Sequence, residues 1–157
     1  MSSSCIQQQT ELSVNTSCQK DNIKKVTTED TKCPDRWTRF ESSCYYKSTY
    51  LAPWDISRMF CQREGSYLVI INSVEEKDFV TKVNHNEESW IGLHVGWSPQ
   101  KKEFDWIWVD GSPLAEIFRK TENLNKVTDH STEAYLNAEG KITERSGRKS
   151  KLFTCEK

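Results

Sequence analysis

Residues 90–93 read Trp-Ile-Gly-Leu, and residues 106–112 read Trp-Ile-Trp-Val-Asp-Gly-Ser. The first stretch is a short apolar run, which is typical of a buried strand. The second predicts a strand over residues 104–109, because alternation along it can bury both Trp106 and Trp108 on one face of a sheet. Asp110-Gly111 then predicts a turn that closes this strand.

Two helices are predicted before these strands. The first covers about 54–64 and stops at Gly65, a residue suited to the position after a helix end. The second covers 74 to about 83, with Ser73 as its N-cap and Glu76 three residues on, which is the capping-box pattern. Further strands are expected at 37–40, 44–46, 67–71, 134–137, 141–143 and 151–155. Since strands and helices do not alternate regularly, the pattern favours an α+β fold.

The N-terminal segment differs from the rest of the chain in polarity and periodicity. Residues 1–32 are polar and aperiodic, which predicts a flexible stalk, and the domain is expected over 33–157. Asn15 begins the Asn-x-Ser/Thr sequon of the stalk and is the candidate glycosylation site. Residues 112–131 predict a long loop, with one turn of helix around 114–118.

Charge and hydropathy argue against binding to nucleic acid or to anionic membrane. The formal net charge is -1 and the sequence pI is near 6.3, so there is no bulk attraction to nucleic acid or anionic membrane. No stretch approaches the roughly 20 apolar residues of a membrane span. We therefore expect any membrane anchor or signal to lie outside these 157 residues.

Six cysteines are scattered from end to end, at positions 5, 18, 33, 44, 61 and 155. No Cys-x-x-Cys pair occurs, and the three histidines do not stand at zinc-finger spacing. An even, scattered set predicts disulfides formed in an oxidising compartment.

These segments resemble the C-type lectin-like domain. The resemblance rests on five motifs in order: 33–37 with 44–46, Trp54 with Cys61, 90–93, 106–112, and 153–155. It implies an α+β domain of two helices, two small antiparallel sheets and a long loop region, with disulfides Cys33–Cys44 and Cys61–Cys155. The family's further disulfide would fall at Glu133 and Gly147, and neither is cysteine. That departure predicts greater mobility over 131–151 and the long loop.

Within this family, 33–37 and 110–114 look most like natural-killer-cell lectin-like receptors, and 133–137 like the lectin-like ligands of such receptors. The resemblance implies extracellular recognition of a cell-surface protein. It further implies a glycosylated, single-pass type II membrane protein. Cys5 and Cys18 would form interchain disulfides that link two copies into a homodimer. An internal Cys5–Cys18 loop is the alternative. A secreted or virus-encoded decoy shares the same chemistry.

Calcium-dependent sugar binding is the rival function. Sugar-binding members carry Glu-Pro-Asn or Gln-Pro-Asp and Trp-Asn-Asp triplets, because a hard cation needs several converging oxygens. Here 116–125 holds no proline between acceptors, and 139–144 replaces the second triplet. Glu122, Asn123 and Asn125 offer a residual cation site, for which a solvated loop is the simpler interpretation. We expect no cofactor and no bound metal.

Catalysis is not expected, because the histidines lack a nucleophile in a recognisable setting and the cysteines are assigned to disulfides. Recognition then depends on the surface. Trp97 is predicted to lie in a loop, as a ligand contact or packed beneath that loop, and the basic residues predict either a ligand-facing rim or scattered solubility charge. The candidate contacts are Trp97, Lys101, Lys102, Phe104, Arg119, Lys120, Arg145 and Arg148.

Overall fold

The computed structural model describes residues 32–127, 132–147 and 149–157. The chain divides into two units, Met1–Asp35 and Arg36–Lys157. All the helices and strands described below belong to the second unit. Among the described residues, no helix has the length and apolarity needed to cross a membrane. Asn15, Cys5 and Cys18 lie outside the described residues, as do Arg148 and most of the expected stalk.

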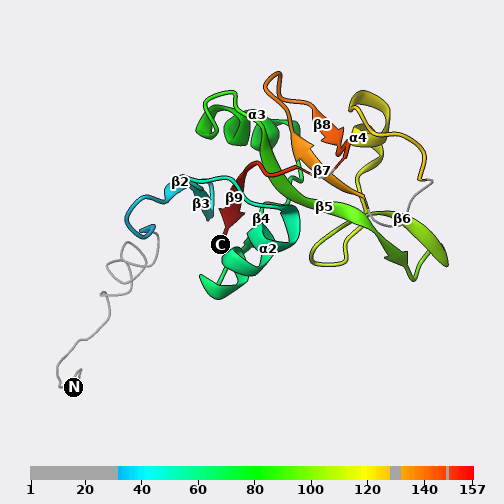
Figure 1. Cartoon of the computed structure of the whole chain (residues 1–157), viewed down its shortest axis with the longest axis horizontal. Helices are drawn as coiled ribbons and strands as arrows, with labels where there is room; N and C mark the ends of the chain where they lie inside the picture. Colours follow the sequence, from blue (N-terminus) through cyan, green and yellow to red (C-terminus); the bar gives the residue numbers. More distant parts are fainter. Residues whose placement is uncertain (1–31, 128–131, 148) are drawn as a thin grey trace, which may run out of the picture. The chain divides into compact units, whose positions relative to one another are not determined.

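The strands form one eight-stranded sheet, whose main path runs β2-β3-β9-β5-β7-β8, with β4 paired to β9 and β6 paired to β5 (Figure 1). Most neighbours are antiparallel, but β5 and β9 pair in parallel through Ser89↔Leu152 and Trp90↔Phe153. This parallel contact joins the two expected small sheets into one. The strands are β2 (Thr38–Phe40), β3 (Ser43–Lys47), β4 (Tyr67–Leu68), β5 (Ser89–Ser98), β6 (Glu103–Trp108), β7 (Glu133–Leu136), β8 (Ile142–Glu144) and β9 (Leu152–Glu156).

The helices are α2 (Trp54–Arg63), α3 (Val74–Val83) and the short α4 (Glu116–Thr121). Helix α3 has the predicted bounds, and the Ser73 side chain accepts a hydrogen bond from the Glu76 N–H, as a helix cap should. The second half of the capping box differs from the prediction: Glu76 Oε1 accepts from the Asn72 N–H. The helical turn expected at 114–118 begins later and continues as α4.

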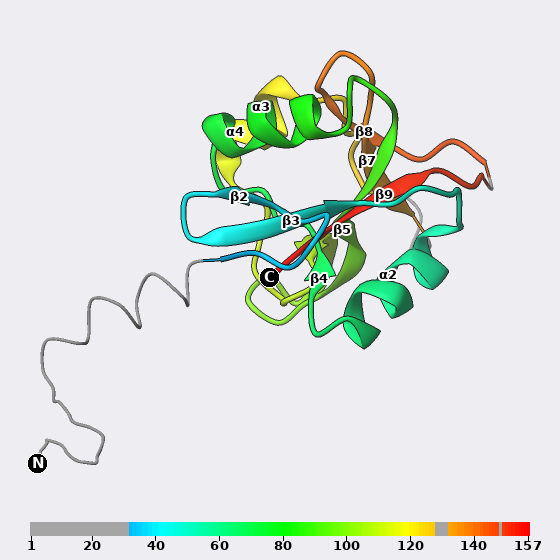
Figure 2. The ribbon, with the colours of Figure 1, turned by 90° about the vertical axis from the view of Figure 1, so that its left-hand side faces the viewer.

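Helices α2 and α3 lie on opposite sides of the strands β3, β9 and β5 (Figure 2). Alternation along β5 serves both sides. Trp90 packs with Trp54 and Cys61 of α2, whereas Ile91 belongs to the core that contains Val80 of α3. Trp90 and Ile91 are each fully buried. The apolar run at 90–93 is therefore a central strand that is covered on both faces.

Gly92 is required by close packing of the backbone. A Cβ at this position would lie 2.6 Å from the Leu68 carbonyl oxygen and 3.1 Å from that of Val69. The glycine N–H donates to the Val69 carbonyl at 2.8 Å. Any side chain here would push β4 away from β5, which explains glycine within an otherwise apolar strand.

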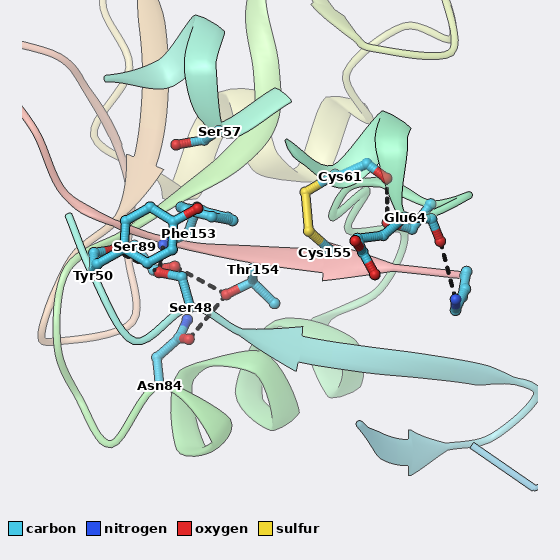
Figure 3. The surroundings of a disulfide bond; sticks show 12 residues. Ser48, Tyr50, Ser57, Cys61, Glu64, Asn84, Ser89, Phe153, Thr154 and Cys155 are labelled. Atoms are coloured by element: carbon cyan, nitrogen blue, oxygen red, sulfur yellow. Dashed lines mark hydrogen bonds between the residues drawn. A yellow bond between two sulfur atoms is a disulfide. The ribbon is translucent and has the colours of Figure 1, made fainter. Parts of the chain in front are cut away.

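A disulfide joins Cys61 of α2 to Cys155 of β9, with a Cα–Cα distance of 5.5 Å, and this is the pair that the family resemblance implied. Close to it, Thr154 donates to Asn84 and shares a hydrogen bond with Ser89 (Figure 3). Cys33 and Cys44 are also disulfide-bonded. Their pairing with each other stays a prediction.

Candidate ligand-binding surface

The β5–β6 hairpin carries two exposed aromatic side chains that pack against each other. Trp97 and Phe104 are cross-strand partners, and their ring centroids lie 5.6 Å apart in an edge-to-face arrangement. Trp97 is 53% exposed and Phe104 38%. Figure 1 shows this hairpin reaching away from α3 and the β2–β3 pair. Aromatic side chains of this kind offer large contact area with little entropy to lose.

The prediction that Trp97 lies in a loop is wrong, because this residue lies within β5. The strand continues to Ser98, since β6 pairs with it through Ser98↔Glu103. The apolar run ends at Leu93, so the second half of β5 has only a weak sequence signal. Cross-strand pairing, not local propensity, holds Trp97 in extended backbone.

Asp105 organises two cations in the half of this hairpin that lies near its turn, where Asp105 pairs with Gly96. Arg119 of α4 binds it with two hydrogen bonds, at 2.8 and 3.0 Å, and Lys101 Nζ lies 2.9 Å from it. Burial alone would raise the pKa of Asp105, but the hydrogen bonds from Arg119 and Lys101 bring it down to about 2. Asp105 therefore positions both cations, but its single negative charge cannot neutralise the two of them, and Lys101 stays 45% exposed. Lys102 and Lys120, the neighbours of these cations in the sequence, are exposed as well.

A buried ion pair holds the long loop. Lys77 Nζ of α3 donates to both carboxylate oxygens of Glu122, at 2.8 and 2.9 Å. The side chains are only 11% and 1% exposed. Glu122 also accepts from the Ile142 N–H and the Thr121 hydroxyl. Burial raises its pKa, yet these contacts, led by Lys77, lower it overall.

The Lys77–Glu122 ion pair disfavours the cation site that the sequence offered at Glu122, Asn123 and Asn125. Both oxygens of Glu122 face an ammonium group, so a cation placed there would meet like charge. Asn123 pairs its backbone with Ile142 and Glu144, and the Asn125 carbonyl accepts from the Trp106 indole. In the described part of the chain, no group of three His, Cys, Asp or Glu side chains is arranged to hold a metal ion.

Arg145 lies at a different place from the hairpin. It lines a pocket of about 500 Å³, which also includes Trp54, Glu133 and Lys149. Its guanidinium donates to Glu133 Oε1 at 2.6 Å and to the Gly147 carbonyl. Glu133 and Gly147 are the two positions where the family's further disulfide would fall. Arg145 thus connects them without a covalent bond.

The structure therefore divides the predicted contacts into two groups. Trp97, Lys101, Lys102 and Phe104 share the β5–β6 hairpin, and Arg119 joins them through Asp105. Arg145 belongs to the pocket. Sequence reasoning missed Lys77, because its partner Glu122 lies 45 residues away in the chain. It also missed Asp105, because the strand that contains this residue was predicted from Trp106 and Trp108 alone.

Comparison with known proteins gives one family. The sequence profile described as "Lectin C-type domain" matches residues 50–157. Human "C-type lectin domain family 17, member A" is 39% identical over 80% of this chain and 32% of its own length. Mouse "C-type lectin domain family 10 member A" is 37% identical over 65% of this chain and 32% of its own. This chain thus spans about a third of these relatives.

Solved structures agree with that family. The cow carbohydrate-recognition domain of CD23, crystallised in the presence of an oligosaccharide, superposes with a TM-score of 0.63 at 26% identity, over 81% of this chain and 96% of that one. The mouse Scavenger Receptor C-type Lectin carbohydrate-recognition domain gives 0.61 at 29% identity, over 80% and 95%.

Proposed function

Because the chain belongs to the C-type lectin domain family, we propose that it is the recognition domain of a cell-surface receptor, or of a lectin-like ligand of such a receptor. Its role is to bind a protein on another cell without calcium, in the manner of natural-killer-type receptors. The domain would be extracellular, anchored through a segment outside the chain, and carried on the stalk as a dimer. No catalytic role is proposed.

The observation that carries calcium independence is the Lys77–Glu122 pair. An ion pair with both partners largely buried fixes the long loop from within the protein. Glu122 links α3 to α4 and to β8 through the contacts described above. In a calcium site, carboxylate oxygens such as those of Glu122 would be ligands of the ion. Here the Lys77 ammonium, which belongs to the chain itself, supplies the positive charge that both Glu122 oxygens contact.

The observation that supports a protein ligand is the exposed Trp97–Phe104 pair. Calcium-dependent sugar recognition needs several oxygen ligands that converge on the ion. This surface instead presents two exposed aromatic side chains near the exposed Lys102. Buried aromatic anchors commonly dominate protein–protein binding energy. We expect these two side chains to form the centre of the contact, and the exposed cations to speed encounter with an acidic patch.

Calcium-dependent carbohydrate binding is the second candidate, because solved structures that resemble this chain are named carbohydrate-recognition domains. The two candidates differ in their response to a chelator. A multimer of the full chain is used to stain a panel of cells, and a glycan array is probed in parallel, each with calcium and with EDTA.

We expect cell staining that EDTA leaves unchanged and that Trp97→Ala reduces at least tenfold. Met59→Ala, an exposed apolar side chain on α2, is the matched control and should keep full staining. Glycan binding that disappears with EDTA would reject the first candidate in favour of the second. Staining that survives Trp97→Ala would reject the hairpin as the contact surface.

A further inference from the structure

Three acidic groups from three elements meet between α3 and the β3–β9 pair. The Tyr45 hydroxyl of β3 lies 2.7 Å from Glu76 Oε2 of α3 and 3.3 Å from Glu156 Oε2 of β9. Tyr45 is 2% exposed, Glu156 6% and Glu76 7%. We define these residues as the acid clamp. Figure 2 shows α3 lying over the strands that carry the other two members.

In the part of the chain that the structure describes, the two carboxylates have no cationic partner. Among the described residues, neither Glu76 nor Glu156 takes part in an ion pair. Arg39 of β2 stands opposite Cys44, so alternation places it on the other face from Tyr45. The other partners are neutral donors: the Asn72 N–H for Glu76, and the Ile70 N–H and the Ser43 hydroxyl for Glu156.

The hydrogen-bond geometry has a consequence for protons. Tyr45 carries a single hydroxyl hydrogen, and the shorter contact assigns it to Glu76. The contact with Glu156 can then be a hydrogen bond only if Glu156 is protonated and donates to the phenol oxygen. In that state, Glu156 donates a hydrogen bond to Tyr45 and Tyr45 donates one to Glu76, so both contacts of the phenol are hydrogen bonds. With Glu156 ionised, two buried carboxylates face one another through a phenol with one hydrogen to share.

We propose that the acid clamp holds one extra proton in the folded protein, and that acidification therefore tightens α3 against β3 and β9. The domain is then a pH-responsive module whose fold is reinforced on acidification. This device is independent of which ligand the β5–β6 hairpin binds.

The charges around the acid clamp act in the same direction. Burial, and then the charge of Glu76, raise the pKa of Glu156 to about 7, against an ordinary value of 4.5. Burial, together with the same two carboxylates and Asp110, raises the pKa of the neighbouring Tyr67 to about 12. Because the folded state binds the proton more tightly than the unfolded state, this stabilisation is complete below about pH 4.5 and is lost as pH rises to about 7.

One histidine opposes this trend. Burial, and secondarily Arg58, lower the pKa of His94, so acidification below its ordinary value of 6.5 costs stability. The test therefore uses a difference between variants, in which the His94 effect cancels. The thermal unfolding of the full chain is measured under non-reducing conditions between pH 5 and 8. EDTA is present throughout, so that binding of divalent cations to the carboxylates does not contribute to the pH dependence.

Glu156→Gln supplies a permanent neutral donor at the same position. We expect this variant to melt several degrees above the wild type at pH 8, with a difference that shrinks toward zero at pH 5. Glu75→Gln, on the exposed side of α3, is the matched control, and its difference from the wild type should not change with pH. A Glu156→Gln difference that is constant across this range would overturn the proposal.

A second measurement covers the case in which Glu156→Gln fails to fold. The carboxyl carbon of Glu156 is followed by NMR in the labelled wild-type protein, with assignment through its own side-chain protons. A titration midpoint between about pH 6 and 7.5 is expected from the raised pKa. A midpoint below pH 5 would show that Glu156 is ionised in the fold at neutral pH, and the acid clamp would be rejected.

Discussion

Single side chains at the proposed binding surface are positioned by ion pairs within the domain. Asp105 is buried, and it binds Arg119 and Lys101 at once. A carboxylate in this position acts as a fixed anchor for two cations from different elements. The hairpin is therefore held by ion pairs next to Trp97 and Phe104, and this limits the entropy that these two side chains would lose on binding.

Acid titration provides a test of this anchor. The pKa of Asp105 is lowered from 3.8 to about 2, so its stabilisation is present above pH 4 and is lost as pH falls toward 2. The loss amounts to about 2 kcal/mol. Asp105→Asn should remove this part of the acid dependence when urea unfolding is measured from pH 5 to 2. Glu103→Gln, exposed on the same strand, should leave the dependence unchanged, and an equal effect of both changes would refute the assignment.

The Lys77–Glu122 pair makes a second prediction at this scale. Glu122→Gln leaves the Lys77 ammonium buried without a countercharge, which should cost about 3 kcal/mol in urea unfolding. The double variant Lys77→Met/Glu122→Gln should recover part of that loss, because an apolar side chain needs no partner. A cost below about 1 kcal/mol for Glu122→Gln would mean that this ion pair does not hold the long loop.

At the level of elements, most helix and strand positions follow from local patterns. Helix α3 has its predicted bounds because a Ser73 cap and acidic first turn are local signals. Strand β4 is shorter than predicted, at Tyr67–Leu68, although the apolar run continues to Ile71. Residues 69–71 are buried but not part of the strand, although the Val69 backbone still hydrogen-bonds to Thr154 of β9 and to Gly92 of β5. Periodicity reports burial, and burial alone does not require a strand.

The segment after β8 allows a prediction about element mobility. The greater mobility expected over 131–151 stays a prediction, and part of that range lies outside the described residues. Within the described part, Arg145 connects Glu133 with Gly147, and its backbone N–H donates to the Glu133 carbonyl. Arg145→Ala should speed amide exchange at residues 142–147 at least tenfold, whereas Lys149→Ala should not. Equal exchange in the two variants would contradict this role.

For the whole molecule, the Cys61–Cys155 disulfide joins residues 94 positions apart and ties α2 to the sheet. In the chain-entropy description, a closed loop of that length contributes about 4–5 kcal/mol. Cys61→Ala/Cys155→Ala should therefore lower the free energy of unfolding by about 3–5 kcal/mol in urea, followed by tryptophan fluorescence. A loss below 1 kcal/mol would show that core packing alone holds α2 in place.

The sequence by itself determined the family, the α+β class, and the places of α2, α3 and the central strand. Each of these follows from side chains close together in the chain: a capping serine, an apolar run, a tryptophan alternation, a cysteine at a motif's spacing. Tertiary structure decided the rest. Tyr45 meets Glu76 and Glu156 across separations of 31 and 111 residues, Lys77 meets Glu122 across 45, and cross-strand pairing placed Trp97 in β5. Such contacts depend on how the elements pack together, and a periodic pattern within one element carries no information about the charge that another element will bring to it.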